Sequence, residues 1–185
     1  GKSYSMAFFA EKVRRIVPGN FTFLVMTDRE DLDGQIWRTF IGCGVTDEKT
    51  PRAGSGKELQ EILKGNPRYV FSLIHKFNQP VVEPYSVRDD IIVISDEAHR
   101  TQSGKFARNM WQALPNASFI GFTGTPLFKH DGLTKRIFGN YISRYDFKRS
   151  EEDQSTVKLI YENRGEKLGI ARFDLNDRIA DAIEK

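Results

Sequence analysis

A run of four β-branched residues that ends in two carboxylates limits what this chain can fold into. Residues 91–94 are Ile-Ile-Val-Ile, and Ser95 separates them from Asp96 and Glu97. A run this apolar is typical of a strand buried on both faces. Charged side chains are costly to bury, so we expect both carboxylates at the open carboxyl end of this strand. Carboxylates in that place are suited to hold Mg²⁺ and a water molecule beside a nucleotide phosphate.

The start of the chain carries a second feature of phosphate chemistry. Gly1-Lys2-Ser3 runs directly into apolar residues at helical spacing, which are Met6, Phe9, Val13 and Ile16. Phosphate-binding loops end in Gly-Lys-Ser or Gly-Lys-Thr and continue into a helix whose N-terminus cradles phosphates. Lys2 would then reach the β- and γ-phosphates of ATP, and Ser3 would ligate Mg²⁺. The alternative is an ordinary solvated helix start, and the downstream carboxylates favour the phosphate site.

Strands and helices alternate along the chain. Apolar runs predict strands at 21–26, 69–74, 91–95 and 118–122. Helical spacing predicts helices that carry Leu32 to Phe40, with Thr27-Asp28 as the cap, Leu59 to Leu63, and Phe106 to Leu114. Weaker candidates are strands at 142–147 and 157–161, a solvated loop at 148–153 and a helix at 175–183. This alternation predicts βαβ units, and therefore an α/β fold with a mostly parallel central sheet.

Composition excludes several classes of protein. A length of 185 residues is enough for one domain with a real core. The net charge of +3 permits nucleic-acid binding without requiring it. The single cysteine, Cys43, excludes an internal disulfide and fits a reducing cytoplasm, and three widely spaced histidines argue against zinc. The sequence lacks an apolar run near the ~20 residues of a membrane helix, so we expect a cytoplasmic protein with no membrane partner.

Three motifs, in this order, resemble those of a known superfamily. Gly1-Lys2-Ser3, Asp96-Glu97-Ala98-His99 and Thr123-Gly124-Thr125-Pro126 resemble motifs I, II and III of superfamily 2 helicases and translocases. Further stretches narrow the resemblance to the motor (restriction) subunit of type I restriction enzymes; these are residues 27–35, 96–104, 123–128 and 137–142. The similarity covers roughly residues 1–165.

This resemblance implies a fold and a domain division. It implies a three-layer, RecA-like P-loop NTPase domain whose first strand and part of whose P-loop are missing. In this fold we expect the missing strand next to the strand that ends in Asp96. Residues 1–165 would be the first motor domain, and residues 166–185 a linker or helix toward a second RecA-like domain that is absent.

The resemblance also implies a function. ATP hydrolysis would drive translocation of double-stranded DNA, and the full complex, with methyltransferase and specificity subunits, would cleave the DNA. We expect this piece to be inactive alone, because the loop glycines and the opposing arginines of a second domain lie outside it. Two alternatives remain open: another superfamily 2 helicase or remodelling ATPase, and a non-catalytic nucleic-acid-binding module.

The needs of phosphoryl transfer suggest roles for the acidic pair Asp96 and Glu97, and the resemblance implies the roles of the other candidate residues. Asp96 would hold Mg²⁺ and Glu97 would orient or deprotonate the attacking water, unless the pair only caps a helix. By resemblance, Gly1, Lys2, Ser3 and His99 would contact the ATP phosphates, and Thr123, Gly124 and Thr125 would couple the ATP state to DNA grip. The DNA candidates are Arg29 and Gln35, for which a surface charge cluster is the alternative, and His75 and Lys76, which depart from the family's Thr-x-Gln pattern. We interpret Phe106, Met110 and Trp111 as core residues rather than a base-stacking platform.

Overall fold

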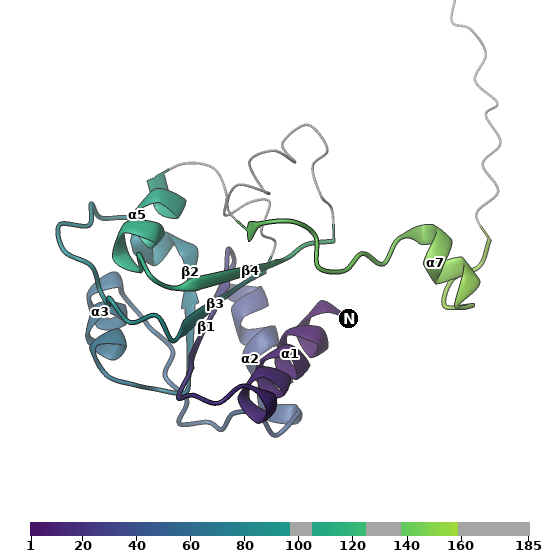
Figure 1. Ribbon diagram of the computed structural model, residues 1–185, viewed down its shortest axis with the longest axis horizontal. Coiled ribbons are helices and arrows are strands. Elements are labelled where there is room, and N and C mark those ends of the chain that lie inside the picture. Colours follow the sequence, from purple (N-terminus) through teal and green to yellow (C-terminus); the bar gives the residue numbers. More distant parts are fainter. Residues whose placement is uncertain (97–104, 125–137, 159–185) are drawn as a thin grey trace, which may run out of the picture. The chain divides into compact units, whose positions relative to one another are not determined.

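The computed structural model describes residues 1–96, 105–124 and 138–158 (Figure 1). The helices are α1 (Lys2–Ile16), α2 (Glu30–Gly42), α3 (Gly56–Lys64), the 3₁₀ helix η1 (Ile74–Phe77), α5 (Lys105–Ala113) and α7 (Phe147–Glu152). The strands are β1 (Thr22–Thr27), β2 (Tyr69–Leu73), β3 (Ile91–Asp96) and β4 (Ser118–Phe122). The chain divides into two compact units, residues 1–141 and 142–185, and α7 belongs to the second. The division at residue 165 that the resemblance implied stays a prediction.

The first unit is built on a four-stranded sheet in the order β2-β1-β3-β4, with every described pair parallel. The apolar runs of β1, β2 and β3 are buried almost throughout, as strands with helices on both faces require. The expected position of a preceding strand is wrong for this sheet, because β1 and β4 already occupy both sides of β3.

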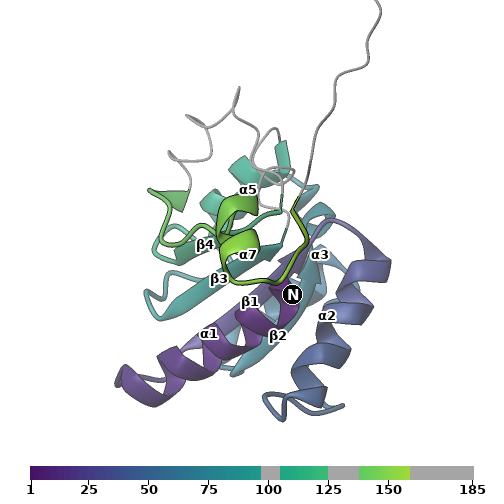
Figure 2. The same ribbon diagram turned by 90° about the vertical axis from the view of Figure 1, so that its right-hand side faces the viewer.

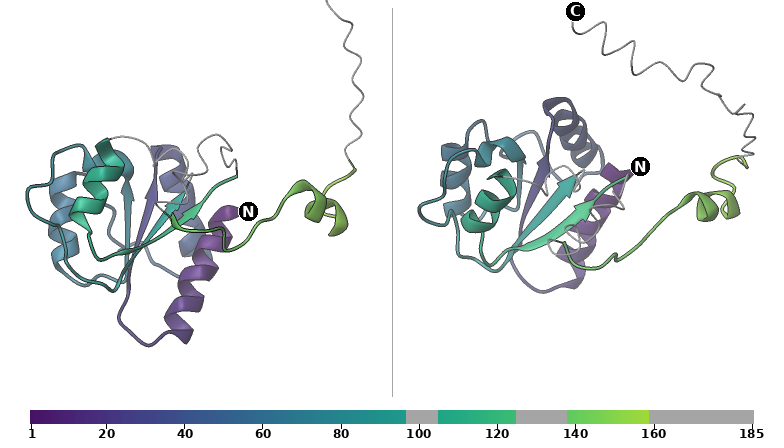
Figure 3. Two further views of the ribbon diagram at one scale, coloured as in Figure 1. Left: turned by 45° about the horizontal axis from the view of Figure 1, so that its top comes forward. Right: turned by 90° about the horizontal axis from the view of Figure 1, so that it is seen from above.

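Helices cover both faces of the sheet, which gives three layers (Figure 3). Successive strand residues point to opposite faces, so Leu24 and Met26 share one buried cluster while Phe23 and Val25 share the other. The first cluster includes residues of α3, η1 and α5. The second includes residues of α1 and α2, which lie side by side in Figure 2. The predicted three-layer α/β fold with a parallel sheet is therefore confirmed.

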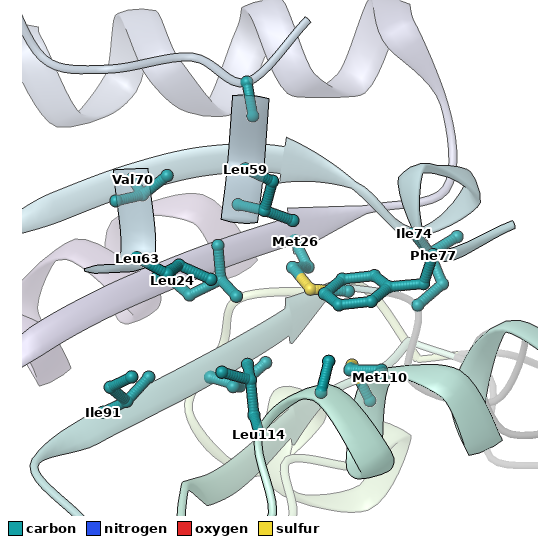
Figure 4. Packing of buried hydrophobic residues seen from close by; sticks show 13 residues of the cluster. Leu24, Met26, Leu59, Leu63, Val70, Ile74, Phe77, Ile91, Met110 and Leu114 are labelled. Atoms are coloured by element: carbon teal, nitrogen blue, oxygen red, sulfur yellow. The ribbon is translucent and has the colours of Figure 1, made fainter. Parts of the chain in front are cut away.

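The cluster under α3 and α5 is a close-packed apolar core (Figure 4). Leu59 and Leu63 enter it from α3, and Phe77 enters from η1. The Phe77 ring stacks on Tyr85, with ring centroids 5.6 Å apart and 16° between the ring planes. Burial of these side chains holds η1 and the connection after it against the sheet.

Element boundaries differ from the sequence prediction in three places. Helix α2 begins at Glu30 with Arg29 at its N-cap, so the predicted cap at Thr27-Asp28 is wrong. The Thr27 hydroxyl instead donates to the Arg29 carbonyl at 3.2 Å. Strand β2 ends at Leu73, and the next four residues form η1.

The third difference lies in the second unit. Residues 141–146 form no strand, and α7 occupies most of the segment predicted as a solvated loop. Asp146 explains the helix, because its carboxylate caps the Arg149 amide at 3.1 Å. Residues 157 and 158 are not in a strand, while residues 159–161 and the helix predicted at 175–183 lie outside the described residues.

Candidate functional site

The parallel register brings the candidate residues to one edge of the sheet. Thr27 pairs with Leu73, and Asp96 pairs with Phe122, so all four strands end at the same edge. Residues that follow the strands therefore meet there, although they are far apart in the sequence. In open α/β sheets, ligands bind at this carboxyl edge.

An ion pair joins the first and second motifs at this edge. Lys2 Nζ lies 3.3 Å from Asp96 Oδ1, and the Asp96 side chain is only 8% exposed. The side-chain periodicities of strand β3 and helix α1 explain why Lys2 and Asp96 meet. Ile94, two residues before Asp96 on the same face of β3, shares a buried cluster with Met6 of α1. Lys2 precedes Met6 by one helical turn, so the ion pair continues this apolar seam to the edge of the sheet.

The third motif reaches the same point. A Cβ atom added at Gly124 would lie 3.9 Å from Lys2 Nζ, so the backbone after β4 runs beside this ammonium group. Thr123 precedes it and is half-buried. The structure thus brings together Lys2, Asp96 and Gly124, each from a different predicted motif.

The N-terminus of α1 is shaped for an anion. Gly1 is the N-cap and supplies no side-chain cap, and its carbonyl accepts from the Tyr4 and Ser5 amides. The first turn carries no acidic residue, so the positive end of the helix dipole is not neutralised from within the helix. Ser3 lies in this turn and is half-buried. Gly1, Lys2 and Ser3 therefore lie where a helix N-terminus favours an anion, and their contact with ATP phosphates stays a prediction.

The residues present fit a magnesium ion. Asp96 Oδ1 is buried and makes no hydrogen bond within the described residues, although the Lys2 ammonium lies at ion-pair distance. The described ranges contain no cluster of three or more His, Cys, Asp or Glu side chains that could hold a metal. Mg²⁺ beside a nucleotide needs no such cluster, because one or two carboxylates, phosphates and waters complete its shell. Asp96 and Ser3 are the protein ligands to expect.

Three predicted site residues lie outside the described ranges. These are Glu97, His99 and Thr125. Their roles in water activation, phosphate sensing and coupling stay predictions.

The DNA candidates lie at or near the same edge on two other elements. Arg29 is the N-cap residue of α2 and pairs with Asp31 at 3.3 Å, with both side chains exposed. Gln35 is exposed further along this helix. His75 and Lys76 lie in η1, and Lys76 Nζ donates to the Gly54 carbonyl at 2.6 Å. The structure therefore places Arg29 beside the strand ends with an exposed guanidinium, whereas the Lys76 ammonium holds the loop before α3.

Two polar features were missed in the sequence. Asp33 on α2 is nearly buried and forms an ion pair with Arg52, whose guanidinium also lies 5.2 Å from the Trp37 ring centroid. Asn109 on α5 is buried as well. A signal for Asn109 existed, because it is a polar residue directly beside Met110 on a helix face predicted to be core.

The prediction for that helix face is correct only in part. Met110 is buried, but Phe106 and Trp111 are each 37% exposed, so they are not core residues. Trp111 packs edge-on against Phe119 of the neighbouring strand β4, with ring centroids 6.3 Å apart. A helix lying on a sheet buries only a narrow stripe, and Trp111 falls on its border, whereas Phe106 lies in the first turn of α5.

Comparison with known sequences places the chain in a family. The sequence matches the family model described as SWI2/SNF2 ATPase over residues 1–185. The chain belongs to the SWI2/SNF2 ATPase family. ATP use by this ATPase domain follows from its family and agrees with the convergence of Lys2, Asp96 and Gly124 at the sheet edge.

Individual relatives of this ATPase domain are restriction enzymes. The type I restriction enzyme HindI endonuclease subunit of Haemophilus influenzae is 41% identical over an alignment of 183 residues, gaps included, and the match covers 88% of this chain and 17% of that subunit. The putative type I restriction enzyme MjaIXP endonuclease subunit of Methanocaldococcus jannaschii is 38% identical over an alignment of 197 residues, gaps included, and the match covers 100% of this chain and 19% of that subunit. The predicted resemblance is confirmed, and the chain spans less than a fifth of the length of these relatives.

A solved structure is also similar to this ATPase domain. It is a nuclease-deletion mutant of the Type ISP restriction-modification enzyme LlaGI in complex with a DNA substrate mimic. The match has a TM-score of 0.42 and 15% identity, and covers 66% of this chain and 12% of that one.

Within the described residues, no helix is long and apolar enough to cross a membrane.

Proposed function

We propose that this chain is the nucleotide-binding part of a motor that translocates double-stranded DNA within a type I restriction endonuclease subunit. The observation that carries the proposal is the meeting of Lys2, Asp96 and Gly124 at the carboxyl edge of the sheet. The relatives in restriction enzymes support the biological setting.

ATP would bind with its phosphates at the N-terminus of α1. Lys2 would leave Asp96 and contact the β- and γ-phosphates, because the phosphates offer it more negative charge. Asp96 and Ser3 would hold Mg²⁺, which when bound neutralises charge on the phosphate oxygens. Glu97 would orient a water molecule for in-line attack on the γ-phosphorus, with ADP as the leaving group.

The DNA part of the proposal rests on the second set of candidates at or near this edge. Arg29 presents an exposed guanidinium at the N-terminus of α2, where a backbone phosphate would meet both a positive side chain and the helix dipole. Gln35 and His75 would add contacts to the same DNA strand, and Lys76 would do so on leaving the Gly54 carbonyl. In the assembled enzyme, methyltransferase and specificity subunits would be the protein partners, and DNA cleavage would belong to the full complex.

The test uses the complete restriction subunit in its assembled complex. ATP hydrolysis is measured with and without double-stranded DNA, and translocation is followed by displacement of a third strand bound downstream. We expect Lys2→Ala to abolish both signals, because the β- and γ-phosphates lose their cation. Lys12→Ala is the matched control, since Lys12 is an exposed lysine on the same helix, and it should keep both. An unmodified complex that neither hydrolyses ATP nor responds to DNA would refute the proposal.

A further inference from the structure

Asn109 makes an unusual pair of hydrogen bonds from the middle of α5. Its side-chain amide nitrogen donates to the carbonyls of Phe77 and Gln79, each at 2.7 Å. The residue is 5% exposed, and its bond to the Phe77 carbonyl is shielded from water, while the bond to Gln79 is partly buried. Both amide hydrogens are used, and both accepting carbonyls lie at or just after the end of η1.

These bonds satisfy carbonyl groups that the short helix cannot. A helix leaves its last carbonyls without partners of its own, and a single 3₁₀ turn has little else to hold it. An apolar side chain in place of Asn109 would leave two carbonyls without this donor, one of them in a buried bond. Asn109 therefore fixes where η1 ends relative to α5.

Helix α5 also holds the rest of the connection from η1 to β3. The Ala113 carbonyl accepts from the amides of Tyr85 and Ser86, at 2.8 and 3.2 Å. Asn116, just beyond the helix, donates to the Val87 carbonyl at 2.7 Å. Of these contacts, those of Asn109 are the ones that reach the end of η1, while the others act on residues 85–87.

The two elements joined by Asn109 belong to different parts of the proposed motor. Helix α5 is the first described element after Asp96 in the sequence, and so follows the segment that carries the acidic pair. The turn η1 carries the DNA candidates His75 and Lys76 at the carboxyl edge. A shift of α5 would move the end of η1 with it, because the two hydrogen bonds of Asn109 connect them.

We propose that Asn109 is a positioning residue that couples the nucleotide state of the acidic segment to the placement of the DNA-contacting turn η1. The proposal rests on the proposed function, because it assigns a mechanical link between its two sites. Asn109 touches neither ATP nor DNA and acts through the backbone of residues 77–79.

The first test compares Asn109→Ala with Asn116→Ala in the complete subunit within its complex. ATP hydrolysis is measured without DNA and with saturating double-stranded DNA. We expect Asn109→Ala to lower the stimulation by DNA at least ~5-fold, a typical coupling between sites, with the DNA-free rate largely kept. Asn116→Ala removes an amide-to-carbonyl bond on the same connection and should leave the stimulation unchanged. Equal loss in both variants, or unchanged stimulation in a folded Asn109→Ala complex, would overturn the coupling.

A second measurement needs no variant and can refute the coupling if Asn109→Ala does not fold. Hydrogen–deuterium exchange of residues 74–79 is compared in the unmodified complex with and without a non-hydrolysable ATP analogue. Coupling predicts that nucleotide changes the exchange of this turn, whereas a purely structural Asn109 leaves it constant. A complex that binds nucleotide and responds to DNA, but shows constant exchange here, refutes the coupling alone. A complex without DNA-stimulated hydrolysis refutes the proposed function and the coupling with it.

Discussion

The Lys2 ammonium lies 3.3 Å from the Asp96 carboxylate, so the side chains proposed to bind phosphate and Mg²⁺ neutralise each other's charge. This pair joins the first turn of α1 to the last residue of β3 across 94 positions of sequence. It also keeps a nearly buried carboxylate from being left without a cation, which is costly.

Removing the Lys2 charge should therefore destabilise the nucleotide-free domain as well as stop catalysis. Lys2→Met leaves the Asp96 carboxylate without this cation, and we expect a loss of about 1 kcal/mol in the free energy of unfolding, since Lys2 is partly solvated. In an Asp96→Asn background the same change should cost almost nothing. Denaturant unfolding of all four proteins gives the coupling energy, and a value of zero would show that the pair contributes nothing.

Acid should weaken the packing of α1 through Glu11. Hydrogen bonds from the Arg14 guanidinium, and then from the Tyr69 hydroxyl, hold the pKa of Glu11 below the ordinary value of 4.5, although burial opposes them. The unfolded chain then binds more protons than the folded one in acid. The contribution of Glu11 is present above pH 4.5 and is lost as the pH falls below that value.

Thermal unfolding from pH 6 to pH 3 measures this effect. Glu11→Gln should show a smaller fall in melting temperature than the unmodified protein over this range. Tyr69→Phe keeps Arg14 and should retain most of the dependence. If Glu11→Gln and the unmodified protein lose stability in parallel, other carboxylates carry the acid sensitivity.

Two glycines in helices should respond oppositely to alanine. At Gly56, the first residue of α3, an added Cβ would overlap the Lys76 carbonyl oxygen of η1. We expect Gly56→Ala to cost about 1–3 kcal/mol, because backbone must move to admit the methyl group. At Gly34, within α2, the nearest atom would be Arg38 Nη2 at 3.6 Å, an ordinary contact with a flexible side chain. Gly34→Ala should stabilise by about 0.5–1 kcal/mol.

Chemical denaturation of the two alanine variants measures both changes in the free energy of unfolding, the expected loss at Gly56 and the expected gain at Gly34. A neutral Gly56→Ala would mean that α3 and η1 are not held as closely as the structure places them. The Gly34 variant reports helix propensity alone and serves as the control.

The core beneath α3 and α5 should depend strongly on Phe77. This ring is fully buried and stacks on Tyr85, so Phe77→Ala should cost about 3–5 kcal/mol in unfolding free energy. Val82→Ala lies in the same connection at a side chain that is almost fully exposed, and should change stability by less than about 0.5 kcal/mol. Equal effects of the two changes in urea unfolding would contradict the packing shown in Figure 4.

Much of the fold and part of the site follow from local sequence patterns. The apolar runs at 91–94 and 118–122 are too short and too β-branched or aromatic for helices, and their alternation with amphipathic segments leads to a parallel sheet. The spacing of Met6 and Phe9 likewise predicts α1. Local patterns failed where a single hydrogen bond decides the structure, as at Asp146, whose cap starts α7 in a segment predicted as a loop.

The sequence by itself predicted a nucleotide-binding domain, because Lys2, Ser3 and Asp96 lie in motifs that are specific in combination, and the ATPase family match agrees. Only the tertiary structure decided which of these residues meet. The parallel register sets the ends of β3 and β4 at one edge, and the apolar seam between Ile94 and Met6 fixes Lys2 against Asp96. The tertiary structure also decided that Asn109 donates hydrogen bonds to the end of η1. A hydrogen bond between residues 30 positions apart depends on packing that no local sequence pattern predicts.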